Sequence, residues 1–265
     1  MQNAKNIKVQ NRNKIAVFRP ENVLKKTKEI ADRYGFDFFG FPLFELVARK
    51  DALAEIESVF GDGVDIAVFT SINGVKKAFA ICNGKFDLNK KFRDDNVAVC
   101  AIGPATKAEL VNNGLHVHVM PVEYSSDGLK SVFDAIEVKD TKIVFLRSSE
   151  GGKDIITFLE GKGAFVTDIA IYSMKEIALA ECEELFNELV WYGPDYVIFT
   201  SSLTFRIFLK HTKELNITEK VFENAKIVAI GDLTAETITE EGIIVDLVAQ
   251  KSTIEDLLKE LGADL

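Results

Sequence analysis

The chain has 265 residues, 47% of them hydrophobic, and it carries a formal net charge of −9. This length suffices for one large domain or for two of ordinary size, each with a buried core. The acidic balance argues against a general binder of nucleic acid or of membrane surfaces, because phosphate-rich partners need clustered lysine and arginine side chains.

The cysteines and the N-terminal segment indicate where the protein works. Cys82, Cys100 and Cys182 are an odd set without a C-x-x-C pair, so neither a disulfide framework nor a zinc cluster is indicated. Residues 1–13 are polar and basic and lack the apolar core of a signal peptide, and no run of about 18 apolar residues follows. The sequence predicts a cytoplasmic protein with a frayed N-terminus and no membrane span.

Short apolar runs alternate with segments of helical periodicity from residue 14 onward. The apolar runs predict strands at 14–18, 66–69, 97–102, 117–120, 143–146, 166–171, 196–199, 227–230 and 243–247. The helical segments lie at 23–34, 73–82, 106–112, 126–136, 153–162, 181–190, 203–211, 234–240 and 253–261. Left-handed glycines are expected to end four of them, at Gly35, Gly114, Gly163 and Gly242. This alternation predicts an α/β fold with parallel sheets covered by helices on both faces.

An internal repeat runs through the chain. Residues 67–71 (AVFTS) return at 197–201 (VIFTS), and residues 101–106 (AIGPAT) return at 229–234 (AIGDLT). The spacing between the copies is nearly constant, since it is the same for Gly103 and Gly231, for Arg19 and Arg147, and for Gly35 and Gly163. The repeat predicts that one α/β unit has been duplicated.

Two extended segments, 38–47 and 167–177, occupy equivalent places in the two copies. If they are paired linker strands, one domain is discontinuous and comprises residues 1–40 plus 178–265. The other domain, 47–168, is then inserted into it. Two similar domains of this kind suggest a ligand cleft between them.

Polar residues follow the predicted strands, at the sheet edge where α/β proteins bind ligands. A hydroxyl at Thr70, Ser71, Ser201 or Ser202 would either cap the following helix or bind a ligand, and its recurrence in both copies favours the ligand. The two Ile-Gly-x-x-Thr turns pair a glycine that allows close approach with a threonine; they are Gly103 with Thr106 and Gly231 with Thr234.

The charged and aromatic residues that are candidates for the site could each have either a functional or a structural role. Arg19 and Arg147 could fork onto carboxylates or phosphates, or form ion pairs within the protein. Tyr172 lies in a predicted linker and could donate a proton to a leaving hydroxyl, or pack between domains. His116 and His118 share a strand face without a third ligand nearby, so no metal site is predicted.

Six motifs together resemble those of the uroporphyrinogen-III synthase family. They are Phe69-Thr70-Ser71-x-Asn73-Gly74-Val75, Ala101-Ile102-Gly103-Pro104-Ala105-Thr106, Tyr124-Ser125-Ser126-x-Gly128-Leu129, Ile171-Tyr172, Phe199-Thr200-Ser201-Ser202 and Ala229-Ile230-Gly231-x-x-Thr234. Each motif is loose, but their order and spacing over residues 14–262 make the set specific.

The resemblance implies two flavodoxin-like parallel-sheet domains joined by a two-stranded linker, with the active site in the cleft between them. It implies a cofactor-independent enzyme whose substrate is hydroxymethylbilane, a linear tetrapyrrole with eight carboxylates. Water is lost, a spiro intermediate forms at ring D, and reclosure with ring D inverted gives uroporphyrinogen III. The family also implies a monomer that receives its substrate from the upstream bilane-forming deaminase.

The family's site residues carry over position by position. Tyr172 matches the tyrosine proposed to assist departure of the hydroxyl. The implied substrate-binding residues are Arg19, Thr70, Ser71, Gly103, Thr106, Ser201, Ser202, Gly231 and Thr234. Asp232 and Lys107 depart from the family pattern, and an acid at position 232 would repel a substrate carboxylate.

Two other functions remain as alternatives. A non-catalytic two-domain sensor could close on an anionic small molecule. An enzyme acting on a phosphorylated metabolite is disfavoured, because the sequence has no P-loop and no Gly-x-Gly-x-x-Gly motif.

Overall fold

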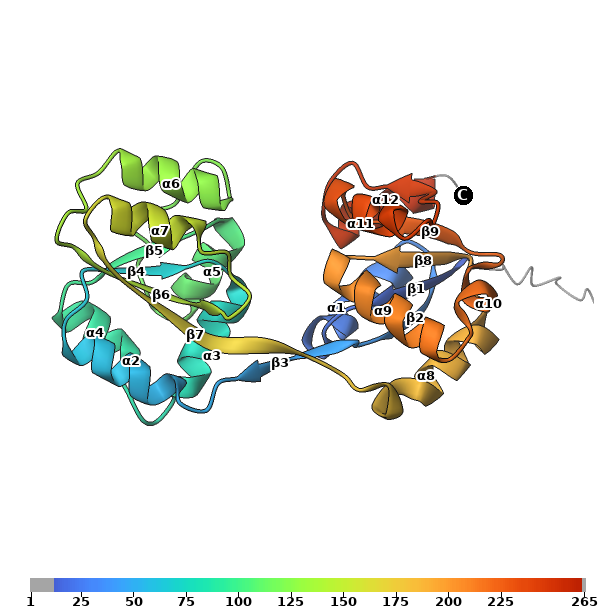
Figure 1. Cartoon of the computed structure of the whole chain (residues 1–265), viewed down its shortest axis with the longest axis horizontal. Helices are drawn as coiled ribbons and strands as arrows, with labels where there is room; N and C mark the ends of the chain where they lie inside the picture. The colour runs from blue at the N-terminus through green and yellow to red at the C-terminus, as the bar shows by residue number, and fades with distance from the viewer. Residues whose placement is uncertain (1–11, 264–265) are drawn as a thin grey trace, which may run out of the picture. The chain divides into compact units, whose positions relative to one another are not determined.

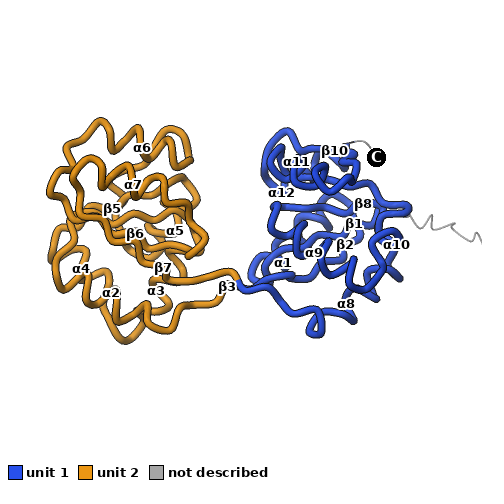
Figure 2. The backbone as a smooth tube through the Cα atoms, in the orientation of Figure 1, with its two compact units in different colours: residues 1–45, 175–265 blue, residues 46–174 orange. Residues whose placement is uncertain are grey.

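The computed structural model describes residues 12–263 and contains two compact units (Figure 1 and Figure 2). Unit 1 comprises residues 1–45 and 175–265, and unit 2 comprises residues 46–174. The segment 1–11, most of the predicted frayed terminus, lies outside the described residues. Unit 1 is thus built from both ends of the chain, with unit 2 inserted between them.

The sheet of unit 1 has five parallel strands in the order β10-β9-β8-β1-β2. They are β1 (Lys14–Phe18), β2 (Asp37–Phe41), β8 (Tyr196–Phe199), β9 (Lys226–Ala229) and β10 (Leu247–Val248). Strand β1 lies inside the sheet: Ile15 pairs with Phe38 on one side and with Tyr196 on the other. Its residues 15–18 are fully buried, as is typical of a parallel strand covered on both faces.

The sheet of unit 2 has the order β3-β7-β6-β4-β5. Its strands are β3 (Phe44–Ala48), β4 (Ile66–Phe69), β5 (Ala98–Ala101), β6 (Lys142–Ser148) and β7 (Phe165–Glu176). The pairs β4–β5, β4–β6 and β6–β7 are parallel. An isolated parallel bridge joins Cys100 to Val119 beyond β5.

The two sheets are built from corresponding strands of the repeat. Strands β1 and β2 of unit 1 correspond to β6 and β7 of unit 2, and β8 and β9 correspond to β4 and β5. Val119 holds the place in the first copy that Leu247 of β10 holds in the second, so even the isolated bridge has its counterpart. Each unit therefore combines one half of the first copy with one half of the second.

Helices cover both faces of each sheet (Figure 1). In unit 1, Ile15 and Val17 face the cluster of α1 and α12, whereas the Phe18 ring lies 4.8 Å from that of Phe208 in α9. The helices of unit 1 are α1 (Glu21–Arg33), α8 (Leu179–Tyr192), α9 (Ser202–Glu214), α10 (Thr218–Phe222), α11 (Asp232–Glu240) and α12 (Ile254–Ala263). Those of unit 2 are α2 (Ala52–Gly61), α3 (Ile72–Cys82), α4 (Leu88–Asp94), α5 (Pro104–Asn112), α6 (Ser126–Asp134) and α7 (Asp154–Gly161).

The predicted α/β class with two mainly parallel sheets is confirmed. The four helix-ending glycines are confirmed as well, since their φ angles lie between 77° and 84°. Three helices, α2, α4 and α10, were not predicted. The run predicted as a strand at 117–120 forms only the single bridge at Val119.

The extended segments between the units differ in extent from the predicted linkers. Residues 37–41 form β2 in the sheet of unit 1, and Pro42, which has no N–H to donate, separates β2 from β3. The first two thirds of β7, residues 165–172, pair with β6 inside unit 2. The division between the units falls at 45/46 and 174/175, within β3 and β7, which are neighbours in one sheet.

No helix among residues 12–263 combines the length and the apolar character that a membrane crossing requires.

Gly128, in the first turn of α6, has no room for a side chain. A Cβ at this position would lie 1.9 Å from the carbonyl oxygen of Glu123. We expect Gly128→Ala to lower the free energy of unfolding by about 1 to 3 kcal/mol, because the backbone of the turn must move. Chemical denaturation measures this change. Gly61→Ala is the matched control, since nothing lies within 4 Å of the position that its methyl group would take, and equal destabilisation by both changes would contradict the steric argument.

Candidate functional site

The carboxyl ends of the strands in both units run directly into helix starts. In unit 2, Ser71 follows β4 and caps α3: its Oγ accepts a hydrogen bond from the Gly74 N–H at 2.9 Å. Ser125 caps α6 in the same way, accepting from the Gly128 N–H at 3.0 Å. Capping hydroxyls keep a lone pair and a proton for another partner, so capping does not exclude a ligand.

Tyr172 is the other partner of Ser71. The phenol oxygen lies 3.2 Å from Ser71 Oγ, although the two residues are 101 positions apart in the chain. Tyr172 is on β7 and is only 6% exposed. The structure thus brings together two of the predicted site residues of unit 2, the proton donor Tyr172 and the polar-turn residue Ser71.

The equivalent turn of unit 1 follows β8. Ser201 caps α9, accepting from the Thr204 N–H at 3.2 Å. Ser202 is engaged inside the unit: its hydroxyl donates to the Leu233 carbonyl at 3.2 Å and accepts from Thr237 at 2.9 Å. Ser202 therefore ties α9 to α11, while Thr200 and Ser201 remain half-buried at the sheet edge.

The two predicted glycine turns cap α5 and α11. The Tyr124 side chain lies against Gly103, where a Cβ would be 3.2 Å from the tyrosine Cβ and Cγ. Pro104 at the start of α5 removes one of the amide donors that this turn could offer. At Gly231 a Cβ would lie 3.0 Å from Ser252 Oγ. A side chain at either turn would therefore crowd the neighbouring Tyr124 or Ser252.

The threonines of these two turns are buried. Thr106 is 4% exposed and Thr234 is 5% exposed, each in the first turn of its helix. Asp232, by contrast, is exposed in the first turn of α11, where a carboxylate complements the helix dipole. The exposed surface of the second glycine turn is therefore acidic at this position.

Arg19 follows β1 and lines a pocket that lies wholly within unit 1. Its volume is about 770 Å³, within the range of small-molecule sites. The lining residues include Thr200 after β8, Ile230 after β9, and Ser252 with Thr253 after β10. The pocket therefore lies at the carboxyl edge of one parallel sheet, where such folds bind ligands.

Ser252 and Thr253 were not among the predicted site residues. Thr253 Oγ1 accepts a hydrogen bond from the Asp256 N–H at 3.1 Å and donates to Asp256 Oδ2 at 2.7 Å. This arrangement resembles a capping box, with an aspartate in the place of the usual glutamate, and Thr253-Ile254-Glu255-Asp256 carries its sequence signature. This capping signature stands at the start of the helical segment predicted at 253–261. It could have identified the turn before α12 as a further part of the carboxyl edge of the sheet.

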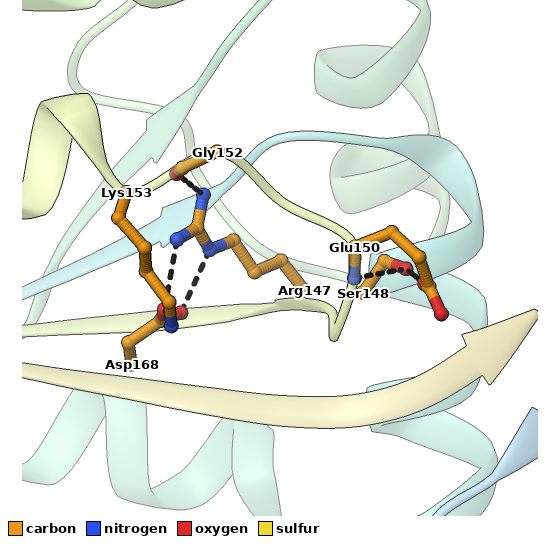
Figure 3. Close-up of polar contacts among 6 residues, drawn as sticks. All are labelled: Arg147, Ser148, Glu150, Gly152, Lys153 and Asp168. Atoms are coloured by element: carbon orange, nitrogen blue, oxygen red, sulfur yellow. Dashed lines mark hydrogen bonds and ion pairs between the residues drawn. The ribbon is translucent and has the colours of Figure 1, made fainter.

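Arg147, the counterpart of Arg19 in unit 2, is paired inside the protein (Figure 3). Its Nε and Nη2 donate to the two carboxylate oxygens of Asp168 at 2.7 and 2.8 Å, and Nη1 donates to the Gly152 carbonyl at 2.8 Å. Lys153 contacts the same carboxylate. Of the two interpretations of Arg147, the internal ion pair is the one that the structure contains.

Two carboxylates at this edge have lowered pKa values. Burial raises the pKa of Asp168, but hydrogen bonds from Arg147 and Lys153 and their charges outweigh it, so the pKa lies below its ordinary value. Burial also raises the pKa of Glu150, and hydrogen bonds from Ser148, the Met174 N–H and Ser149 again lower it overall. Both groups are therefore anionic at neutral pH.

No group of three or more His, Cys, Asp or Glu side chains within the described range 12–263 is placed to hold a metal ion. His118 Nδ1 accepts a hydrogen bond from the Val99 N–H at 3.0 Å, and its ring meets that of His116 edge to face at 4.8 Å between centroids. The two histidines thus have structural contacts in unit 2.

A family model described as uroporphyrinogen-III synthase HemD matches residues 25–259. A putative uroporphyrinogen-III synthase of Methanothermobacter thermautotrophicus is 28% identical over 257 residues, which cover 95% of this chain and 98% of the relative. A uroporphyrinogen-III synthase of Chlorobaculum parvum is 23% identical, covering 57% and 60% of the two chains.

Solved structures share the fold. A mutant uroporphyrinogen III synthase of Thermus thermophilus superposes with a TM-score of 0.62 at 16% identity, covering 95% of this chain and 98% of that chain. The enzyme of Helicobacter pylori 26695, described as uroporphyrinogen-III synthetase, gives a TM-score of 0.60 at 17% identity, with coverages of 96% and 99%. The likeness extends over nearly the whole of both chains.

The Arg147–Asp168 pair predicts a pH-dependent contribution to stability. We expect Asp168→Asn to lower the free energy of unfolding at pH 7 by about 3 to 5 kcal/mol, because a buried guanidinium loses its counter-ion. Since the folded pKa of Asp168 is lowered, the contribution is complete above the unfolded value near 4 and is lost as pH falls through the folded value. Denaturation at pH 7 and at about pH 3 should therefore show the difference between wild type and variant shrinking on acidification.

Asp134→Asn is the control for this experiment. Asp134 pairs with Lys162 at 2.7 Å, but its side chain is 71% exposed. We expect a change within about 0.5 kcal/mol at either pH. A constant difference between wild type and Asp168→Asn across the pH range would contradict the assigned ion pair.

Proposed function

The chain belongs to the uroporphyrinogen-III synthase family, and we propose from this premise that it converts hydroxymethylbilane to uroporphyrinogen III. It has the catalytic role of that family, and its substrate is a tetrapyrrole. The observation that carries the proposal is the family match over residues 25–259, nearly the whole chain. A non-catalytic sensor is not favoured by these relatives.

The proposed reaction begins with departure of the terminal hydroxyl of the bilane as water. The resulting azafulvene cation is attacked by the already substituted carbon of ring D, which forms a spiro intermediate. Fragmentation and reclosure then invert ring D. Because the substrate is intrinsically reactive, holding it in one geometry supplies much of the acceleration and selects the type III over the type I isomer.

Tyr172 is the residue we assign to the departing hydroxyl. Ser71 Oγ accepts from the Gly74 N–H, so its own proton is free to be donated to the phenol oxygen 3.2 Å away. With that arrangement the Tyr172 proton is directed to a further acceptor. A leaving hydroxyl that receives this proton departs as water.

The substrate carboxylates are assigned to the helix starts at the sheet edges. These positions offer backbone N–H groups and the positive end of the helix dipole, so an acidic protein can bind an anion there. The assigned residues are Arg19, Thr70, Ser71, Gly103, Thr106, Ser201, Ser202, Gly231 and Thr234. Burial of Thr106 and Thr234 supports a role in shaping their turns, and the contacts of Ser202 support a role in holding α11 against α9.

Several properties of the working enzyme belong to the same proposal. Cys82, Cys100 and Cys182 are buried free thiols, which suits a reducing compartment such as the cytoplasm. We propose that the enzyme needs no cofactor, acts as a monomer, and takes its substrate from the deaminase that forms the bilane.

The direct test is incubation of the purified protein with freshly generated hydroxymethylbilane. Oxidation of the products to porphyrins allows the type I and type III isomers to be separated by chromatography. Type III as the main product without any added cofactor supports the proposal. Formation of type I at the uncatalysed rate would contradict the proposed activity.

The role of Tyr172 is tested with Tyr172→Phe, which removes only the phenol oxygen. We expect kcat to fall by about 10²-fold, the lower range for loss of a general acid, with tetrapyrrole affinity close to that of wild type. Rapid-quench measurement of type III formation gives the rate. Ser71→Ala should reduce the rate in the same direction and add little in the double variant, because both residues act through one hydrogen bond.

Tyr196→Phe is the matched control, since Tyr196 begins β8 at the opposite edge of its sheet from the helix starts. Its kcat should be unchanged. A Tyr172→Phe enzyme as fast as this control would remove Tyr172 from the mechanism.

A further inference from the structure

Tyr172 stands directly after a bulge in the strand that carries it. Strand β7 pairs with β6 in regular register through residue 170, but the next pair is Ser148 with Tyr172, so Ile171 has no partner on β6. Successive side chains of a regular strand point to opposite faces, yet Ile169, Ile171 and Tyr172 all belong to one buried cluster of unit 2. The bulge therefore turns the Tyr172 side chain onto the face that Ile171 occupies, as bulges beside functional sites can do.

The connection between β6 and α7, residues 149–153, is fastened to β7 before this bulge. Arg147, near the end of β6, and Lys153, just before α7, both contact the carboxylate of Asp168 on β7 (Figure 3). Arg147 Nη1 also donates to the Gly152 carbonyl at 2.8 Å. One end of the connection is thus held against the regular part of β7.

Two further hydrogen bonds fasten the same connection to β7 at the bulge and beyond it. The Ser149 N–H donates to the Tyr172 carbonyl at 2.9 Å. Strand β6 has already ended, and the next contact is made by a side chain: Glu150 Oε1 accepts from the Met174 N–H at 3.0 Å. Because neighbouring parallel strands bond through evenly spaced backbone groups, Glu150 takes the place of the carbonyl that a longer β6 would offer.

The Glu150 carboxylate is itself held by two hydroxyl groups. Its Oε1 accepts from Ser149 Oγ at 2.8 Å, and its Oε2 contacts Ser148 Oγ (Figure 3). Burial raises the pKa of Glu150, but the hydrogen bonds from Ser148, the Met174 N–H and Ser149 outweigh it and lower the pKa overall. Both oxygens are therefore acceptors at neutral pH, oriented toward the end of β7.

The equivalent strand end of unit 1 is built differently. There only residues 19–20 separate β1 from α1, whereas residues 149–153 separate β6 from α7. The place of Glu150 in the repeat is taken by Asn22, which lies within α1. Of the two equivalent strand ends, the longer connection stands beside the strand that carries Tyr172.

We propose that Glu150 is a positioning residue for Tyr172. By accepting the Met174 N–H it holds β7 beyond the bulge, and so keeps the phenol oxygen 3.2 Å from Ser71 Oγ. Glu150 acts through the backbone of β7 rather than on the substrate. The inference rests on the proposed function for the role of Tyr172 in the reaction.

The test compares Glu150→Ala, Glu150→Gln and Glu137→Ala in the full chain. Alanine removes the acceptor, whereas glutamine keeps a carbonyl oxygen for the Met174 N–H without the charge. Glu137 is the matched control, because its Oε1 accepts from the Lys139 N–H at 3.0 Å in the connection between α6 and β6. Thermal unfolding of each variant establishes that it is folded.

We expect Glu150→Ala to lower kcat by about tenfold, less than Tyr172→Phe, because the phenol is displaced and not removed. Kd for uroporphyrinogen III, measured by equilibrium dialysis under nitrogen, should stay within about twofold of wild type. Glu150→Gln should regain most of the rate, and Glu137→Ala should match wild type. Glu150→Ala combined with Tyr172→Phe should be as slow as Tyr172→Phe alone.

Amide hydrogen exchange measured by NMR reports the same contact without the reaction. The Met174 N–H should exchange faster in Glu150→Ala than in wild type, because it loses its acceptor. Its exchange rate should be unchanged in Glu137→Ala.

A Glu150→Ala enzyme with kcat within about twofold of wild type would overturn the assignment. A glutamine variant as slow as the alanine variant, or independent effects of Glu150→Ala and Tyr172→Phe, would do the same. Failure of the proposed function is seen separately, as absence of the type III isomer with the wild-type enzyme. The exchange rate of the Met174 N–H then still decides whether Glu150 holds β7.

Discussion

The pairing of β1 with β8 decides how this chain is divided into units. Lys14 and Asp195, at the start of the two strands, are joined by a hydrogen bond of 2.7 Å although 181 residues separate them. Because β1 lies inside its sheet, unit 1 must draw on both copies of the repeat. Turns from the first copy, such as Arg19, and from the second, such as Thr200, consequently line one pocket.

The two units share strand order and register but differ in the side chains at equivalent positions. Corresponding strands lie in the same order, and the register that pairs Phe145 with Asp168 also pairs Val17 with Gly40. The shared plan fixes where an arginine and a capping hydroxyl stand. The residue at one place on the neighbouring strand, Asp168 in unit 2 and Gly40 in unit 1, then determines whether the arginine has a carboxylate partner on that strand.

Sequence periodicity was enough to predict most of the helices and strands, because buried parallel strands and amphipathic helices have distinct patterns of apolar residues. The helices α4 and α10 are 7 and 5 residues long, too short for a helical period to be recognised. Capping serines could be predicted since a cap is local. The contacts of Tyr172 with Ser71 and of Arg147 with Asp168 depend on strand order and register, which no local pattern encodes.

The discontinuity of unit 1 also bears on how the protein is made. Ribosomes deliver residues 46–174 before residues 175–265, so unit 2 has its complete sequence while β1 still lacks β8. Until then the apolar residues 15–18, fully buried in the finished protein, have no complete sheet in which to be buried. During synthesis the N-terminal strand is thus an apolar segment without its final neighbour, and a chain halted near residue 174 would contain the whole sequence of unit 2 but only β1 and β2 of the sheet of unit 1.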